Sequence, residues 1–108
     1  LWWGAAPAKL KGLIDRAFLP GIAFAYEGDG HFPKKLFEGR TARVLITADT
    51  PPWYLWLGYR NGWLNVLRRQ ILDFVGLKVT HMKVVGTIRD ATPARIEQFF
   101  AVARKLAG

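Results

Sequence analysis

Residues 42–52 read ARVLITADTPP, an apolar run that ends in a polar turn. The first seven, 42–48, are mostly apolar and rich in β-branched side chains, which predicts a strand buried on both faces of a parallel sheet. Asp49, Thr50 and two prolines follow at once, and neither a strand nor a helix continues easily through them. The stretch therefore predicts a strand with a loop at its carboxyl end.

Segments with helical periodicity alternate with strand-like runs along the rest of the chain. In chain order the predicted elements are a helix over 7–18, the strand over 42–48, a helix over 62–75, a strand over 78–88 and a helix that opens at Thr92 and Pro93. Gly76 supplies the stop of the second helix and Thr92 the cap of the third. This order predicts an α/β protein with a parallel sheet and right-handed crossovers.

Two strands are too few for the three predicted helices. Each helix has an apolar face wide enough to cover a sheet, and two parallel strands could not shield all three faces. The chain begins with Leu1, and its only methionine is Met82. We therefore expect residues 1–108 to be the C-terminal half of one larger domain, with three further strands upstream of Leu1.

The connection over residues 19–40 is long for a structureless loop. Glycines and prolines punctuate it, and it carries four aromatic side chains. Long loops in compact domains are usually functional or disordered, and the aromatic content favours a packed functional loop.

The composition is that of a globular protein and excludes several kinds of site. Only 22% of the residues are charged, and the chain has no cysteine, which excludes disulfides, thiolate metal sites and a cysteine nucleophile. No other candidate metal site stands out. No apolar stretch approaches the roughly 20 residues of a membrane span. We expect a soluble protein, and a reducing, cytoplasmic compartment is compatible with the lack of cysteine.

The net charge of +8 comes from 16 Lys and Arg side chains against 8 Asp and Glu. Three interpretations are open: a solvated basic surface, attraction of an anionic cofactor or substrate, and nucleic-acid binding. The basic residues are scattered along the chain rather than gathered in one run. This scatter favours a solvated surface, and we expect no nucleic-acid partner.

Ligands bind at the carboxyl ends of strands in open parallel α/β sheets, so the loops that follow strands are the candidate sites. One is residues 1–7, LWWGAAP, where two tryptophans offer an aromatic wall and Gly4 lets the backbone approach a flat ring. The tryptophans are equally well explained as core anchors. The other is residues 47–54, TADTPPWY, whose best proton donor is Tyr54. Taken alone, this loop is also ordinary turn chemistry.

Residues 1–26, LWWGAAPAKLKGLIDRAFLPGIAFAY, carry a more specific pattern. They closely resemble the central motif of the NAD(P)H:quinone oxidoreductase family, flavoproteins with a flavodoxin-like fold. The matching positions are Leu1, Trp3, Pro7, Ala8, Leu10, Lys11, Gly12, Asp15, Arg16, Phe18, Gly21, Ala23, Phe24 and Tyr26. The resemblance continues beyond Tyr26 and covers nearly the whole chain.

The resemblance implies a flavodoxin-like, doubly wound parallel sheet of which this chain is the C-terminal part. It also implies a two-electron flavin reductase that works by ping-pong hydride transfer through the flavin N5. FMN or FAD would be the cofactor, NAD(P)H the co-substrate and a quinone-like small molecule the acceptor. Members of the family form dimers, so we expect a homodimer.

The resemblance also assigns roles to individual positions. The residues that would line the isoalloxazine ring are Leu1, Trp2, Trp3 and Gly4, and those at its pyrimidine edge are Thr47, Ala48 and Asp49. Tyr54 matches a tyrosine that helps to stabilise charge on the reduced ring, and it is both the catalytic candidate and a cofactor contact. Phe24 and Tyr26 match an aromatic pair that gates the acceptor site, contributed in family dimers by the neighbouring subunit.

Two features depart from the family pattern. Residues 55–64 contain no histidine, although the family often places one shortly after the position of Tyr54, so Tyr59 or Arg60 would have to replace it. The loop that binds the flavin phosphate is expected upstream of Leu1. The alternative to an enzyme is a non-catalytic flavodoxin-like fragment, or a regulatory subunit that binds a partner through its exposed sheet edge. An anion or nucleic-acid binder is suggested by charge alone.

Overall fold

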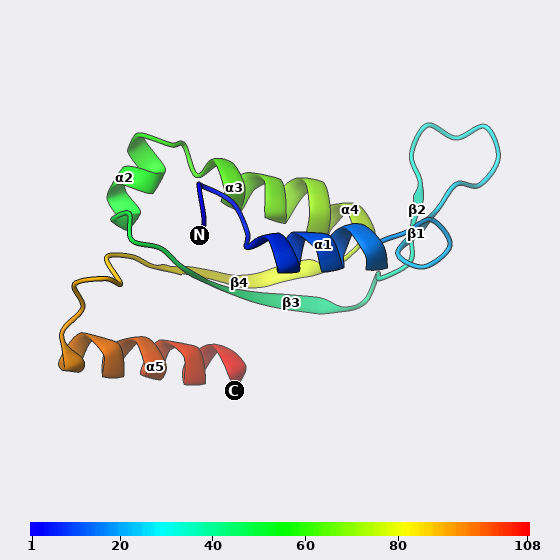
Figure 1. Ribbon diagram of the computed structural model, residues 1–108. Coiled ribbons are helices and arrows are strands. Elements are labelled where there is room, and N and C mark those ends of the chain that lie inside the picture. Colours follow the sequence, from blue (N-terminus) through cyan, green and yellow to red (C-terminus); the bar gives the residue numbers. More distant parts are fainter.

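The computed structural model describes all of residues 1–108. Two parallel strands form its centre, β3 (Thr41–Thr47) and β4 (Lys78–Val85), with Thr41 opposite Lys78 and Thr47 opposite Val85. Figure 1 shows the helical segment that contains α3 and α4 on one side of this pair and α5 on the other. The α/β architecture with parallel strands predicted from the sequence is therefore confirmed.

Six helical segments and a small hairpin complete the chain. The helices are α1 (Ala8–Ala17), α2 (Pro52–Leu57), α3 (Gly62–Asn65), the π-helix η1 (Val66–Leu72), α4 (Asp73–Val75) and α5 (Pro93–Ala107). Strands β1 (Phe24–Ala25) and β2 (Lys34–Lys35) pair antiparallel within the long connection over 19–40. None of the helices is both long and apolar enough to cross a membrane.

The core lies between the strand pair and the helical segment over 62–75. Ile46 of β3 packs with Leu67 and Leu72 of η1 in one buried cluster. The sequence predicts an ordinary α-helix here, and that prediction is wrong for 66–72, which are wound as a π-helix. Hydrogen bonds in a π-helix span five residues, so Leu67 and Leu72 share its inner face, and Ile71 packs half-buried beside them.

Two element boundaries also differ from the sequence-based prediction. The sequence-based elements do not include α2, which begins at Pro52 because a proline at the first helical position loses no hydrogen bond. The second strand ends at Val85 rather than at residue 88. It ends there because Gly86 packs against Pro52 and Thr87 adopts a left-handed backbone with φ of 53°.

The outer helices leave their apolar faces largely uncovered. Neither α1 nor α5 has a buried residue, and Leu13 and Phe100 are 62% and 53% exposed. This exposure agrees with the expectation that two parallel strands are too few to cover three helices. Only 9 of the 108 residues are buried, as expected for a two-stranded sheet that carries helices on both sides.

Candidate functional site

The first wall of the candidate site is a tight turn at residues 2–5. Trp2 and Ala5 exchange two backbone hydrogen bonds of 2.9 and 3.0 Å, and Trp3 and Gly4 between them have φ of 49° and 76°. Two successive positive φ angles are typical of a two-residue hairpin turn. The turn leaves the Trp3 side chain fully exposed. The backbone nitrogen of Leu1 donates to the carbonyl of Thr47, which places this segment beside the end of β3.

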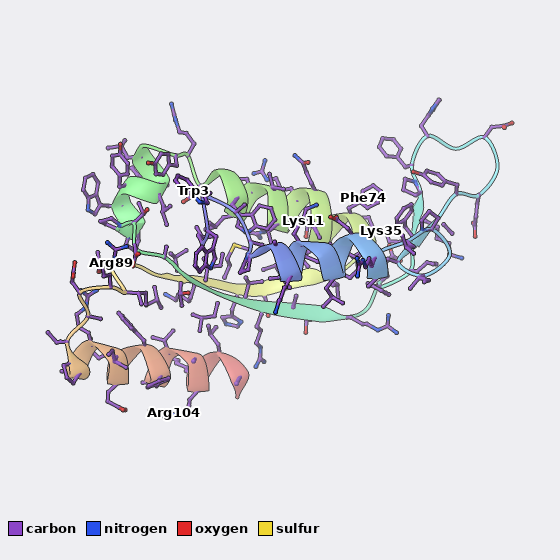
Figure 2. All side chains as sticks on the ribbon, viewed as in Figure 1. Trp3, Lys11, Lys35, Phe74, Arg89 and Arg104 are labelled. Carbon is purple, nitrogen blue, oxygen red and sulfur yellow. The ribbon has the colours of Figure 1, made fainter.

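The carboxyl end of β3 is tied to the loop that follows β4. The amide of Ala48 donates to the Val85 carbonyl at 2.9 Å, and the backbone amide of Arg89 donates to Oδ1 of Asp49 at 3.0 Å. The Arg89 guanidinium lies 3.6 Å from the other carboxylate oxygen of Asp49. Figure 2 shows Arg89 at the α2 end of the strand pair. The Asp49 carboxylate therefore holds the two loops together.

A strained turn between α2 and α3 forms the third wall. Arg60 and Asn61 both have φ of 52°, which is uncommon for residues other than glycine. The turn is fixed by a hydrogen bond of 2.8 Å from the Asn61 amide to the Leu55 carbonyl and one of 2.9 Å from Nδ2 of Asn65 to the Arg60 carbonyl. Backbone strain of this kind concentrates at functional sites.

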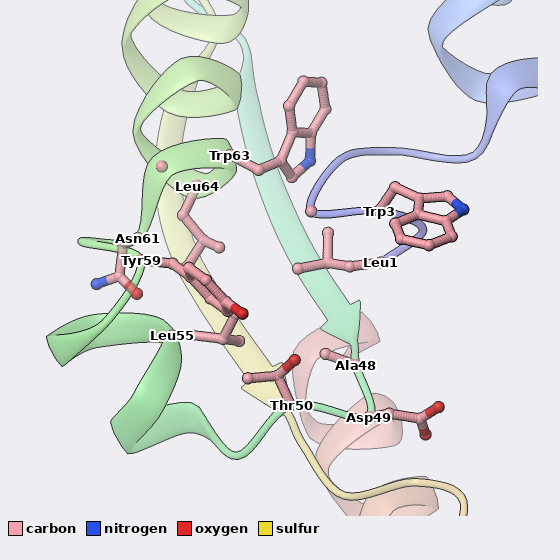
Figure 3. Close-up of a pocket in the computed structure, with 12 residues that line it drawn as sticks. Leu1, Trp3, Ala48, Asp49, Thr50, Leu55, Tyr59, Asn61, Trp63 and Leu64 are labelled. Atoms are coloured by element: carbon pink, nitrogen blue, oxygen red, sulfur yellow. The ribbon is translucent and has the colours of Figure 1, made fainter.

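These three segments enclose a pocket of about 560 Å³ at the carboxyl end of β3. Its lining is mostly apolar and consists of Leu1, Trp3, Gly4, Ala48, Asp49, Thr50, Leu55, Tyr59, Asn61, Gly62, Trp63 and Leu64. Figure 3 shows Leu1 and Trp3 on one side, Tyr59 and Leu64 on the other, and Thr50 at the base. The volume is that of a small-molecule site.

The pocket lies where ligands bind in parallel α/β sheets. The family described as having a flavodoxin-like fold matches residues 1–107. The chain belongs to this flavodoxin-like family. The solved structure of Smu.1420 from Streptococcus mutans UA159 is similar to it, with a TM-score of 0.80 and 27% identity over 98% of this chain and 55% of that one. The chain thus spans about half the length of this relative, and no curated protein matches it.

Membership of the flavodoxin-like family gives the pocket a chemical context. The family is generally oxidoreductase-like and commonly binds flavin. The residues that line the pocket include no lysine, arginine or histidine, and their one acidic side chain is Asp49. The pocket therefore suits a flat, largely uncharged ring better than a phosphate group.

The structure brings together part of the set predicted from the sequence. The pocket is lined by five of the predicted residues, Leu1, Trp3, Gly4, Ala48 and Asp49. Three others, Trp2, Thr47 and Tyr54, do not line it. The third wall, from Leu55 to Leu64, is absent from the predicted site residues. The cue for this wall is Asn61 followed by Gly62, because asparagine tolerates the left-handed backbone that the turn between α2 and α3 requires.

Tyr54 lies behind the pocket wall rather than on it. Its ring packs edge-to-face against Tyr59, with ring centroids 5.1 Å apart, and Tyr59 itself lines the pocket. The Tyr54 ring also covers Gly58, where an added Cβ would lie 2.9 Å from the ring. Tyr54 therefore contacts the site through Tyr59, one of the two residues considered as a replacement for the family histidine. The other, Arg60, is outside the lining.

Phe24 and Tyr26 lie far from the pocket of their own chain. Their rings pack edge-to-face with centroids 5.6 Å apart, and Phe24 also packs against Phe74 at 5.2 Å. They lie at the hairpin end of the molecule, opposite α2, and Phe74 marks that end in Figure 2. Tyr26 is 67% exposed, so its ring is free to contact another molecule.

Proposed function

We propose that this chain belongs to a flavin-dependent NAD(P)H oxidoreductase of the quinone reductase type. The observation that carries the proposal is the aromatic-walled pocket at the carboxyl end of β3, in a family that is generally oxidoreductase-like. The resemblance of residues 1–26 to the quinone oxidoreductase motif supports the same activity. The chain would form the C-terminal part of a single domain whose remaining strands bind the phosphate of FMN or FAD.

The pocket residues fit a flavin ring. Trp3 and Trp63 offer flat apolar surfaces, while the hydroxyl groups of Thr50 and Tyr59 and the amide of Asn61 offer hydrogen bonds to a polar ring edge. When bound there, a flavin would supply the transfer of two electrons from NAD(P)H to a quinone-like acceptor. Leu55, Leu64 and Trp63 would exclude water from the ring.

Tyr54 and Tyr59 would act as a pair. The Tyr59 hydroxyl would donate a hydrogen bond to the ligand, and Tyr54 would hold the Tyr59 ring in place through their edge-to-face contact. In this arrangement Tyr54 keeps the role in stabilising charge that the resemblance implies, exerted through Tyr59. Asp49 would fix the Ala48–Thr50 backbone at the ring edge through its contacts with Arg89.

The acceptor site would be completed by a second copy of the chain. Phe24 and Tyr26 are too far from their own pocket to gate it, and Tyr26 is exposed. A homodimer that places this aromatic pair over the partner's pocket would supply the missing wall. Sedimentation of the full-length protein as a dimer, lost on Phe24→Ser with Tyr26→Ser, would support this arrangement.

The test of the proposed function is flavin binding and turnover by the full-length protein. We expect a yellow protein that oxidises NADH or NADPH in the presence of a quinone. Trp3→Ala should weaken flavin binding, whereas Trp56→Ala should not, because Trp56 is equally aromatic, 66% exposed and outside the pocket. A protein that stays colourless with added FMN and FAD would refute the proposal and favour a non-catalytic, partner-binding role.

The tyrosine pair has its own test. Tyr59→Phe removes the hydroxyl from the pocket wall and should lower kcat about 10²-fold, the scale of a positioned proton donor. Tyr54→Phe keeps the ring contact and should change kcat less, while Tyr54→Ala should lower it as Tyr59→Phe does. Equal activity of Tyr59→Phe and the wild type would remove Tyr59 from the mechanism.

A further inference from the structure

A second hollow lies on the opposite face of the strand pair, under the C-terminal end of α5. Its volume is about 430 Å³. Its lining consists of Arg43, His81, Lys83, Val102, Lys105, Leu106 and Gly108. The groove shares no lining residue with the candidate flavin pocket, which lies at the carboxyl end of β3. We call this hollow the α5 groove.

Strand register gathers the basic side chains on this face. Arg43 pairs with His81 and Leu45 pairs with Lys83, so these side chains point to the same side of the sheet. Their neighbours Val44 and Met82 point to the other side, where they pack against the buried core. Lys105 reaches the groove from the last turn of α5.

The basic side chains of the α5 groove face no acidic side chain. No acidic side chain lines it, and none of its four basic residues takes part in an ion pair. The Arg43 guanidinium donates to the carbonyl of Leu106 at 2.8 Å, which fixes its position at the α5 terminus. Like charges gathered around one hollow repel each other, and a bound anion relieves that repulsion.

The α5 groove does not include the N-terminal segment that lines the candidate flavin pocket. The Ala48 amide points toward β4, so the Thr47 carbonyl, which accepts from Leu1, points to the opposite edge of β3. Leu1 therefore lies along the edge of β3 away from β4, whereas His81 and Lys83 belong to β4.

We propose that the α5 groove binds a multiply charged phosphate anion, such as the diphosphate group of a small metabolite. Three permanent cations and one histidine match a ligand with two or more negative charges. The apolar rim of Val102 and Leu106 would contact a non-polar part of the ligand. The other basic residues are scattered along the sequence, which is why a small anion is favoured over a nucleic acid.

Calorimetric titration of the full-length protein with inorganic pyrophosphate tests this proposal. Lys83→Gln and Lys105→Gln should each weaken binding about three- to fivefold, the scale of one exposed charge contact, and the double variant about tenfold or more. Lys9→Gln is the control, because it removes the same charge from the exposed surface of α1. The imidazole proton resonances of His81 should shift on addition of pyrophosphate.

The results distinguish a specific anion site in the groove from attraction by the net charge of the protein. Weakening confined to the groove variants, together with the His81 shift, supports the proposal. The absence of pyrophosphate binding refutes it, as does equal weakening by Lys9→Gln, which would show attraction by net charge alone. Tighter binding of a DNA or RNA oligonucleotide than of pyrophosphate, with the same dependence on Lys83 and Lys105, would also overturn it in favour of a nucleic-acid surface.

Discussion

An alanine at Gly86 should disturb both the stability of the protein and its candidate flavin pocket. A Cβ at this position would lie 2.4 Å from Cδ of Pro52 and 2.7 Å from the carbonyl oxygen of Thr50. Neither atom can rotate away, because one belongs to a ring and the other to the backbone. Forcing a methyl group into such a contact costs about 1–3 kcal/mol. We expect Gly86→Ala to lower the free energy of unfolding by this amount and to displace Thr50 from the pocket base.

Two measurements and one control variant test this prediction. Urea unfolding followed by circular dichroism gives the stability change, and titration with FMN gives the change in affinity. A displacement that costs 1.4 kcal/mol of binding weakens the Kd about tenfold. In Gly12→Ala the new Cβ meets nothing within 4 Å. Alanine is also the better helix former by about 0.5–1 kcal/mol, so Gly12→Ala should keep or raise stability.

Unchanged stability and affinity would refute a role for the packing of residue 86 in the pocket. If Gly86→Ala unfolds within about 0.5 kcal/mol of the wild type, the change is no larger than an ordinary surface substitution. If its affinity for FMN is also unchanged, the packing of residue 86 against Thr50 and Pro52 does not shape the pocket. Lower stability with unchanged affinity would mean that the loops are packed as described but that Thr50 does not contact the ligand.

Three more predictions concern the core, the cap of α5 and the contact of Asp49 with Arg89. Leu72→Ala should lower the free energy of unfolding by about 2–5 kcal/mol in urea, because it leaves a cavity beside Leu67 and Ile46. Thr92→Ala should cost about 1 kcal/mol in the same assay, since its hydroxyl accepts from the Arg95 amide. Asp49→Ala should raise hydrogen exchange at the Arg89 amide and weaken FMN binding; unchanged exchange would contradict the tether.

Local signals predicted most of the elements. Gly76 ends the central helical segment with φ of 97°, and Thr92 caps α5, as the sequence indicates. Each signal acts through one residue and its immediate neighbours, so it can be interpreted without the rest of the fold. The strand over 42–48 is confirmed to within one residue as Thr41–Thr47, because an uninterrupted β-branched run has few alternatives. The expectation that it is buried on both faces is wrong for this chain, since Leu45 is 39% exposed.

The features that the sequence did not predict depend on contacts between distant segments. The π-helix over 66–72 serves the packing of Leu67 and Leu72 against β3, and its spacing resembles that of an α-helix when viewed alone. The pocket wall around Asn61 needs a left-handed turn without a glycine at either strained position. The position of Tyr54 behind Tyr59 is set by side-chain packing, which no spacing rule contains.

The parallel pairing of β3 with β4 also bears on how the protein acquires its site during folding. The two strands are separated by residues 48–77, and that loop must close before they can pair. Single helices form in about a microsecond or less, whereas non-local strand pairing is far slower. Because the Ala48 amide and the loop after Val85 meet only in the paired state, the pocket forms late. FMN added during refolding should therefore bind in the last kinetic phase, after the helical signal has recovered.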